Sequence, residues 1–325
     1  MARKNFSEDT KSRYINLCKV ETTIPIFSQP WWLDSVSGKG NWGVCLVEKD
    51  SEVIASMPYE VENRLGFNLI KMPLLTQNLG PWIRPSKLKY TNKLSQQKKL
   101  MNQLIDQLPK YDYFSQNWHY SQTNFIAFFW RGFQQSSKYT YVIEDLSDLD
   151  GVWNGFQSKI KGDIKKARDR FKLVIDENLT IDDFINLNSQ VFHRQNIMSP
   201  YSDQSIVLLD QACFENNASK MFIAVDEKGR KHAAVYIVWD HNSAYYLLGG
   251  GDPELRNSGA TSFCMWEAIK FASTVANKFD FEGSMIEPIE RFVRAFGATQ
   301  IPYHSITKTP SLLLRTRSAL LQILS

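Results

Sequence analysis

The sequence has few of the residues that build metal or disulfide sites. Its four cysteines are Cys18, Cys45, Cys213 and Cys264, and they form neither a C-x-x-C pair nor a Cys/His cluster. That absence excludes the common structural zinc motifs, so we expect no metal. Four cysteines scattered through a long chain indicate free thiols in a reducing compartment, each expected to be a small buried side chain.

Long apolar runs are also absent. Residues 1–6 lack the apolar stretch of a signal peptide, and no run approaches the roughly 18 apolar residues of a membrane span. The sequence therefore predicts a cytoplasmic protein without an integral span. The leucine-rich segment 311–325 is expected to form a terminal helix on the protein body, with a membrane-surface helix as the alternative.

Charge and composition are those of a folded soluble chain. The net charge of +4 is too small on its own to indicate nucleic acid, although it is compatible with an anionic ligand. With 43% hydrophobic residues, the composition excludes a disordered chain. A length of 325 residues suits two domains, and we place the boundary near 146–151, giving domains 1–150 and 151–325.

The first domain is predicted to contain strands around one central helix. Alternation and turn residues predict a hairpin over 42–59, and helical spacing predicts a helix over 94–108 that ends before Pro109. The other apolar runs predict strands over 67–72, 111–114, 125–130 and 139–143. This is a mixed α/β (α+β) layout with much antiparallel pairing.

The second domain is predicted to begin with helices and to continue with an antiparallel meander. Helices are expected over 152–171, 181–192 and 205–214, and strands over 221–225, 232–239 and 245–248. A helix over 258–276, a strand over 279–282, a helix over 286–296 and a strand over 301–306 follow. The two domains share no residue-level repeat, so any duplication is one of fold.

The strongest candidate for chemistry is the glycine-rich turn between the strand 245–248 and the helix 258–276. Gly249, Gly250 and Gly251 end the strand, and residues 256–261 lead into the helix. A helix N-terminus attracts anions through its unpaired N–H groups, and glycines allow a diphosphate to approach the backbone. The spacing fits neither a Walker loop nor G-x-G-x-x-G. A turn in which the glycines only relieve strain explains the pattern equally well.

Several motifs in this half resemble the C-terminal domain of FemAB-like proteins, the GNAT-type acyltransferases that include the lipid II aminoacyl ligases. They are Tyr-Leu-Leu-Gly-Gly-Gly-Asp over 246–252, Arg-x-x-Gly-Ala over 256–260, Trp-Glu-Ala over 266–268, Phe-Asp-Phe-Glu-Gly-Ser-Met over 279–285, Glu-Arg-Phe over 290–292 and Phe-Gly-Ala over 296–298. Segments 25–32 and 73–81 resemble the first domain of those proteins. The resemblance is greatest to the branch also described as BioF2-like acetyltransferase domains.

This resemblance implies two tandem GNAT-like acyl-CoA N-acyltransferase domains, with the acyl donor between splayed parallel strands at 245–248 and 279–282. The coenzyme A contacts that it implies are Gly249, Gly250, Gly251, Arg256, Gly259, Ala260 and Thr261. The usual pattern, Gln/Arg-x-x-Gly-x-Gly/Ala, has a small residue where this chain has Thr261, which weakens the match. The implied substrate contacts are Asp252, Ser284 and Arg291, and a turn role is the alternative for Asp252.

Three residues are candidates for proton transfer. Glu282 ends a strand at the predicted cleft, where a carboxylate can accept a proton from an amine and burial raises its pKa. Capping of the following helix is the alternative for Glu282. Tyr246 and Tyr303 are candidate acids for a leaving thiolate, although an aromatic residue on a strand more often belongs to the core. No serine or cysteine lies in a G-x-S-x-G frame, so direct transfer is the simplest mechanism.

A second departure from the family pattern concerns the donor. Fem aminoacyl ligases have Phe-Lys-x-x-Phe-Gly in the late helix, whereas this chain has Val293 at the lysine position and Arg294 beside it. This difference favours acyl-CoA over aminoacyl-tRNA. A basic segment is either a solvated helix face or a platform for an anion such as tRNA; its residues are Lys159, Lys161, Lys165, Lys166, Arg168 and Arg170.

The sequence therefore predicts an acyltransferase that moves an acyl group other than an aminoacyl group. The donor would be acyl-CoA, and the acceptor an amine of an amino sugar or of a peptide-like cell-envelope precursor. Two alternatives stay open. One is an aminoacyl-tRNA-dependent Fem-type ligase acting on a peptidoglycan precursor, and the other is a non-catalytic GNAT-like binding module.

Overall fold

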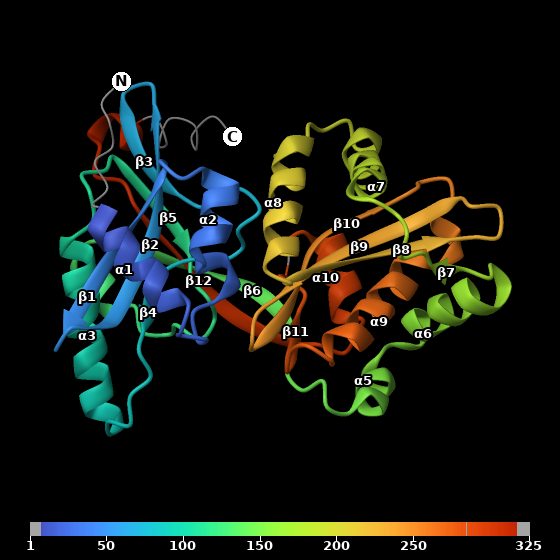
Figure 1. Cartoon of the computed structure of the whole chain (residues 1–325), viewed down its shortest axis with the longest axis horizontal. Helices are drawn as coiled ribbons and strands as arrows, with labels where there is room; N and C mark the ends of the chain where they lie inside the picture. Colours follow the sequence, from blue (N-terminus) through green and yellow to red (C-terminus); the bar gives the residue numbers. More distant parts are fainter. Residues whose placement is uncertain (1–7, 284, 317–325) are drawn as a thin grey trace. The chain divides into compact units, whose positions relative to one another are not determined.

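The structure is a computed structural model that describes residues 8–283 and 285–316. The chain folds into two compact units (Figure 1). Unit 1 contains Met1–Lys138 and Pro302–Ser325, and unit 2 contains Tyr139–Ile301. This division differs from the predicted one at 150/151. The boundary falls inside strand β6 (Gln134–Ile143), and strand β12 (Thr299–Lys308) returns the chain to unit 1.

The sheet of unit 1 begins with an antiparallel meander. Strands β1 (Trp42–Lys49) and β2 (Glu52–Arg64) form the predicted hairpin, and the turn residues Asp50 and Ser51 both have positive φ, as a tight hairpin requires. Strand β3 (Phe67–Lys71) is antiparallel to β2, which also pairs with β4 (Trp82–Ile83). Strand β5 (Tyr113–Asn117) is parallel to β3 and antiparallel to β12.

Unit 1 contains helices α1 (Glu8–Cys18), α2 (Pro30–Ser37), α3 (Tyr90–Asp106) and α4 (Ile126–Trp130), and a 3-10 turn at Ile26–Ser28. The helix predicted over 94–108 is confirmed with an earlier start. The strand predicted over 125–130 is wrong, because these residues form α4. The Phe125 carbonyl accepts hydrogen bonds from the N–H groups of Phe128 and Phe129 at 2.9 and 3.1 Å. A short aromatic run has no periodicity that distinguishes a helix from a strand.

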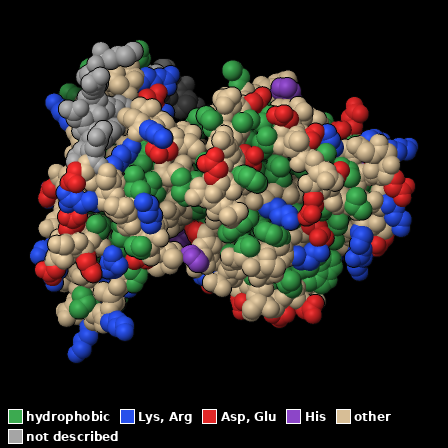
Figure 2. All heavy atoms as spheres, viewed as in Figure 1, with side chains coloured by type: hydrophobic (Ala, Val, Ile, Leu, Met, Phe, Trp, Pro, Cys, Tyr) green, Lys and Arg blue, Asp and Glu red, His purple; other side chains and the backbone are tan. Residues whose placement is uncertain are grey.

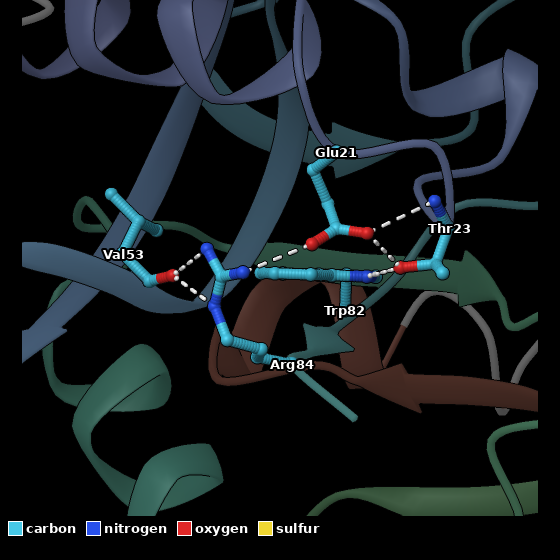
Figure 3. Close-up of polar contacts among 5 residues, drawn as sticks. All are labelled: Glu21, Thr23, Val53, Trp82 and Arg84. Carbon is cyan, nitrogen blue, oxygen red and sulfur yellow. Dashed lines mark hydrogen bonds and ion pairs between the residues drawn. The ribbon is translucent and has the colours of Figure 1, made fainter. Parts of the chain in front are cut away.

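An arginine-centred network connects the segment after α1 to the sheet of unit 1 (Figure 3). Arg84 donates to the Val53 carbonyl through Nε and Nη2, at 3.1 and 2.9 Å, and to Glu21 through Nη1 at 3.1 Å. Glu21 also accepts from the N–H and hydroxyl groups of Thr23, and the Thr23 hydroxyl accepts from Trp82 Nε1 at 2.9 Å. Because each polar group has its partner within unit 1, we assign this network a structural role.

The sheet of unit 2 contains the predicted meander at its centre. Strands β8 (Ser219–Val225), β9 (Lys231–Trp239) and β10 (Ser243–Gly251) are successively antiparallel. Strand β7 (Val174–Ile175) pairs with β8 at one edge. On the other side, β11 (Lys278–Asp280) runs parallel to β10, and the end of β6 pairs antiparallel with β11.

Helices cover both faces of this sheet (Figure 1). Helices α6 (Ser158–Lys165) and α9 (Ala260–Ala272) contribute to one buried core with β8 and β9, and helix α10 (Glu287–Arg294) contributes Val293. On the opposite face, Phe184 of α7 (Ile181–Arg194) packs edge-on against Tyr236 of β9, with ring centroids 5.5 Å apart. Helix α8 (Asp203–Glu215) follows α7.

The single helix predicted over 152–171 is instead divided. Helix α5 (Leu149–Gly155) ends before Phe156 and Gln157, which are extended, and α6 begins after them. A π-helical turn, Lys166–Arg170, continues α6. The predicted terminal helix falls mostly on 317–325, outside the described residues, and 312–316 are helical. In the part of the chain that is described, no helix has the length and apolar character needed to cross a bilayer.

Candidate active site

Strands β10 and β11 pair over a short length and then part. Their parallel pairing covers Ser243 to Tyr245 on β10 and ends at the pair Tyr245–Asp280. Beyond it β10 continues to Gly251, paired only with β9, while β11 ends. The register with β9 shifts between Tyr246 and Leu248, so Leu247 is an extra residue of a bulge. The open edge of β10 therefore begins at Tyr246.

A pocket of about 490 Å³ adjoins this open edge and lies wholly within unit 2. Its walls come from the end of β10, the turn after β10, the start of α9, the last two turns of α7, the loop after α7, and α10. The lining residues are Asn188, Val191, Phe192, Arg194, Tyr201, His232, Tyr246–Pro253, Arg256, Ala260, Thr261, Pro288, Ile289 and Phe292. Most of the predicted coenzyme A contacts are thus brought together in one place.

The three glycines belong to strand β10 and not to the predicted turn. A side chain on Gly250 would meet the backbone of Leu187 and Asn188 in α7, and one on Gly249 would meet the Tyr246 hydroxyl. The absence of a side chain at Gly250 thus allows α7 to pack directly on β10. The Asn188 side chain fixes this contact by donating from Nδ2 to the Gly249 carbonyl at 2.8 Å.

The turn from β10 into α9 points the N-terminus of α9 at the pocket. Asp252 accepts from the Glu254 N–H at 2.8 Å, which is the predicted turn role, and it also lines the pocket. Gly259 has φ +81°, and a side chain there would meet the backbone of Asp163 in α6. Glycine is thus required at 259 both for the left-handed conformation and for helix packing. Helix α9 then begins with Ala260 and Thr261 at the pocket wall.

Two arginines supply positive charge to the pocket. Arg256 comes from the turn before α9 and Arg194 from the last turn of α7, and both are exposed. Among the ion pairs of the described residues, neither arginine has a carboxylate partner, whereas Arg291 and Arg294 pair with Glu287 and Glu290. Unpaired guanidinium groups beside a helix N-terminus form a site suited to a phosphate-bearing ligand.

Two tyrosines line the same pocket. Tyr201 donates to Asn188 Oδ1 at 3.2 Å, so Asn188 links Tyr201 to the Gly249 carbonyl. The Tyr246 hydroxyl lies against the Cα of Gly249, with no hydrogen-bond partner among the described residues. Burial raises the pKa of Tyr246 to about 12, so this phenol keeps its proton at neutral pH. The sequence predicted Tyr246; it gave no signal for Tyr201 or Asn188, which lie in a loop and a helix remote from the glycine motif.

A buried acidic pair stands where β11 ends. Asp280 is 2% exposed and accepts hydrogen bonds from the Thr140 hydroxyl and from the Glu282 N–H, the latter at 2.8 Å. Burial raises the pKa of Asp280 to about 6. Glu282 has a left-handed backbone, with φ +57°, and its Oε1 is buried without a hydrogen-bond partner in the described chain. Burial, then the neighbouring Asp280 and Asp240, raise the pKa of Glu282. Glu282 does not line the pocket.

Comparisons with known proteins agree with this geometry. The family model for an acetyltransferase (GNAT) domain matches residues 155–283, which contain the meander, the glycines and α9. A crystal structure of FemX superposes with a TM-score of 0.64 at 12% identity, covering 86% of this chain and 91% of FemX. Residues 155–283 therefore form a GNAT domain, and the chain shares its fold with FemX.

Two further solved structures share the fold of this chain. The C-terminal domain (DUF2156) of a protein described as a lysylphosphatidylglycerol synthetase from Agrobacterium fabrum has a TM-score of 0.56 at 9% identity, covering 96% of this chain and 97% of that one. A conserved protein of unknown function from Bacteroides thetaiotaomicron has a TM-score of 0.56 at 12% identity, covering 92% and 97%. At such identities the likeness shows the fold alone. A search of curated sequences gave no match.

Besides Glu282 and Gly259, two more predicted site residues do not line the pocket. Tyr303 lies on the section of β12 that belongs to unit 1. Arg291 is exposed on α10 and pairs with Glu287 at 2.8 Å, away from the lining. Ser284 lies outside the described residues. Their roles remain predictions that rest on the family resemblance.

A core residue occupies the position at which Fem aminoacyl ligases have a lysine. Val293 is 1% exposed and belongs to the buried core of unit 2. Arg294 is exposed and pairs with Glu290 at 2.8 Å, and Glu290 accepts from the Tyr141 hydroxyl at 2.7 Å. Arg294 is thus engaged outside the pocket and does not replace the missing lysine.

The basic segment is partly neutralised by its own acids. Lys166 pairs with Asp163 at 2.9 Å, and Arg168 with Asp169 at 2.8 Å. The described contacts show no ion pair for Lys159, Lys165 or Arg170, which are exposed. None of these residues lines the pocket, and α6 packs against Gly259 through the backbone of Asp163.

Proposed function

We propose that unit 2 transfers an acyl group from an acyl-CoA to an amine. The GNAT domain match supports acyl transfer in general. The observation that carries the finer proposal is the parting of β10 and β11 after Tyr245, because a pocket of about 490 Å³ opens at the exposed edge of β10. An acyl thioester is a slender chain, and an unpaired strand edge offers it backbone hydrogen bonds.

The residues at one end of the pocket fit the diphosphate of coenzyme A. The first turn of α9 presents N–H groups that no helical carbonyl can reach. The Ala260 N–H is engaged by the Ser258 hydroxyl at 3.3 Å, and the N–H groups of Thr261 and Ser262 have no acceptor among the described residues. Together with Arg256 and Arg194, these groups form a charge-complementary cradle. Thr261 can serve here because the backbone, not the side chain, makes the contact.

An acyl-CoA supplies, when bound, a thioester whose acyl carbon forms a C–N bond to the amine as its C–S bond breaks and the thiol leaves with a proton. The Gly249 N–H group can polarise the thioester carbonyl. The Gly249 C=O points to Asn188 and not to β9, and in a strand the N–H of a residue faces the same edge as its C=O. Tyr246 is the proposed proton donor to the thiolate, since its hydroxyl is in the pocket and stays protonated.

Glu282 is the proposed proton acceptor for the amine. A buried carboxylate oxygen without a partner is costly to leave unsatisfied, and an amine or ammonium group would satisfy it. The raised pKa of Glu282 makes its carboxylate a stronger base than an exposed one. We infer that the acceptor reaches the thioester from the side of Asp280 and Glu282, and that it is an amine of an amino sugar or of a peptide-like cell-envelope precursor.

Aminoacyl transfer is the second candidate. It is favoured by the fold neighbours, since one is named FemX and another is described as a lysylphosphatidylglycerol synthetase. The exposed Lys159, Lys165 and Arg170 would give a tRNA an anchoring surface. Against it stands Val293, whose burial leaves no basic group at the ligase lysine position.

Thermal unfolding with coenzyme A, acetyl-CoA and bulk tRNA separates the candidates. A ligand at about 100 times its Kd stabilises the protein by roughly 2.7 kcal/mol. We expect coenzyme A and acetyl-CoA to raise Tm and tRNA to leave it unchanged. Stabilisation by tRNA alone would favour aminoacyl transfer. A protein that responds to none of the three would be a non-catalytic binding module.

A further inference from the structure

The pocket of unit 2 has two chemically different walls. The turn before α9 and the start of α9 supply the charged and polar wall described above. The lining also includes an apolar set, which we call the α7–α10 wall: Val191 and Phe192 from α7 and Pro288, Ile289 and Phe292 from α10. Helix α7 contributes the polar Asn188 and Arg194 as well. Backbone donors and two arginines account for a diphosphate and a thioester, but they leave the α7 and α10 side chains without a ligand group to contact.

Apolar side chains are also exposed in two segments next to this lining in the sequence. Just before α10, Met285 and Ile286 are 64% and 60% exposed, and the lining residue Ile289 of α10 is 45% exposed. In the loop after α7, Ile197 and Met198 are 50% and 94% exposed, between the lining residues Arg194 and Tyr201. The face of unit 2 drawn in Figure 2 shows apolar side chains among the charged ones. Exposed apolar groups gathered around a pocket mark a binding surface more often than single scattered ones do.

An acetyl group places only one methyl group beyond the thioester carbonyl, which is too short to cover the side chains of Val191, Phe192 and Ile289 together. A chain of roughly eight carbons would cover Val191, Phe192 and Ile289 and remove them from solvent.

We propose that the donor of unit 2 carries a medium-length or longer apolar acyl chain, which lies against the α7–α10 wall. This inference rests on the proposed function, because it assumes that coenzyme A carries the chain. The α9 end of the pocket binds the diphosphate, and the apolar wall makes the affinity depend on the length of the acyl chain. Shorter donors bind through the polar end alone.

Isothermal titration with coenzyme A, acetyl-CoA and octanoyl-CoA tests the proposal. Acetyl-CoA is expected to bind about as tightly as coenzyme A. Octanoyl-CoA is expected to bind roughly 50-fold more tightly than acetyl-CoA, since burying even half of its six extra methylenes has about this effect. Equal affinity for the two acyl-CoAs would overturn the chain-length proposal and leave the donor assignment intact. Absence of binding by all three would overturn both.

A pair of matched variants locates the chain. Ile289 lines the pocket and Leu208 lies on α8 outside it, and both are 45% exposed. Ile289→Asn is expected to weaken octanoyl-CoA about tenfold with less than a threefold effect on acetyl-CoA, and Leu208→Asn to change neither. Equal losses in the two variants, or no loss in Ile289→Asn, would contradict the placement of the chain.

Octanoic acid distinguishes the source of the chain. If the acyl group arrives on coenzyme A, free octanoate is expected to bind at least 100-fold more weakly than octanoyl-CoA, because it lacks the diphosphate. Octanoate that binds as tightly as octanoyl-CoA would show that the apolar wall serves another molecule, and the proposal would fail.

Discussion

The two units repeat one order of elements but differ at the place where a ligand would bind. Each has an antiparallel three-stranded meander, then a helix, then a strand parallel to the last strand of the meander. In unit 1 these are β1–β3, α3 and β5, and in unit 2 they are β8–β10, α9 and β11. In both, the parallel pairing is short: it covers Leu69 and Ile70 on β3 and ends at Tyr245 on β10.

In unit 1 the space between the parting strands β3 and β5 is filled. Leu79 forms a parallel bridge with Trp118 just after β5, and its N–H donates to the Asn117 carbonyl at 2.7 Å. Trp118 is fully buried, and Gly80 packs so closely on its ring that a side chain at 80 would collide with it. The segment that follows β3 therefore occupies the space that the pocket occupies in unit 2.

The connection to the following helix explains this difference. In unit 2 only residues 252–259 separate β10 from α9, so the helix N-terminus comes directly to the strand end. In unit 1 residues 72–89 separate β3 from α3, and part of that segment forms β4 and the bridge to Trp118. The fold alone therefore does not make the site. A short glycine-containing turn opens it, and a long connection fills it.

The largest expected effect concerns Trp118, which fills the space between β3 and β5 in unit 1. Trp118→Ala should lower the free energy of unfolding by about 3–5 kcal/mol, because it empties a fully buried site. Coenzyme A affinity should stay unchanged, since the pocket belongs to unit 2. Chemical denaturation measures the first and titration the second. Trp130→Ala, at a residue 61% exposed in the same unit, is the control and should cost far less. A large loss of coenzyme A affinity in Trp118→Ala would contradict the assignment of the donor site to unit 2.

The next effect concerns the acidic pair of unit 2. Because the folded pKa of Asp280, about 6, lies above its ordinary value of 3.8, the unfolded chain loses this proton first as pH rises. Stability contributed by the protonated group is therefore present below pH 4 and is lost between about pH 4 and 6. Asp280→Asn removes this loss and keeps an oxygen for Thr140 and Glu282. It should stabilise the protein by about 3 kcal/mol at pH 7 and by little at pH 4.

The control for this measurement is the exposed Asp150→Asn, which should give the same small change at both pH values. A gain from Asp280→Asn that is equal at pH 4 and pH 7 would contradict the raised pKa of Asp280. Denaturant unfolding at the two pH values gives the comparison directly.

A smaller effect tests the contact between β10 and Tyr246. Gly249→Ala should cost about 1–3 kcal/mol, because the added methyl group meets the Tyr246 hydroxyl. In a Tyr246→Phe background the same change should cost less, since the colliding oxygen is gone. A double-mutant cycle on unfolding free energies measures this coupling. Strict additivity of the two changes would show that the hydroxyl lies elsewhere.

The smallest effect contrasts one arginine in each unit. Arg256→Gln should weaken coenzyme A about tenfold, near 1.4 kcal/mol, because a charged hydrogen bond to a phosphate is lost. Arg64→Gln in unit 1 changes the net charge equally and should have little effect. Titration at low and high salt measures both. Equal losses in the two variants would mean that overall charge, and not the pocket, attracts the ligand.

Sequence patterns predicted the centre of unit 2 well. The meander, the helix after the glycines and the short strand at 279–282 are confirmed within a few residues, because alternation and turn residues are local signals. Tyr246 and Glu282 belong to two different motifs of the sequence, and the structure places Tyr246 in the pocket wall but not Glu282.

Other features depend on contacts between distant segments. Asn188 in α7 and Tyr201 in the loop after it reach β10 only through the fold, and burial raises the pKa of Asp280. The need for glycine at 250 and 259 comes from helices α7 and α6, which the sequence does not place there. Replacing Gly259 would consequently disturb packing, so Arg256 is the better position for testing the ligand.

Hydrogen–deuterium exchange with and without saturating coenzyme A tests the central claim most directly. We predict slower exchange for amides in residues 246–262, where β10 loses its partner and α9 begins, with no change over residues 67–83 and 113–118 of unit 1. Protection in those segments of unit 1, or saturating binding without protection over 246–262, would contradict the assignment of the donor site to the parting of β10 and β11.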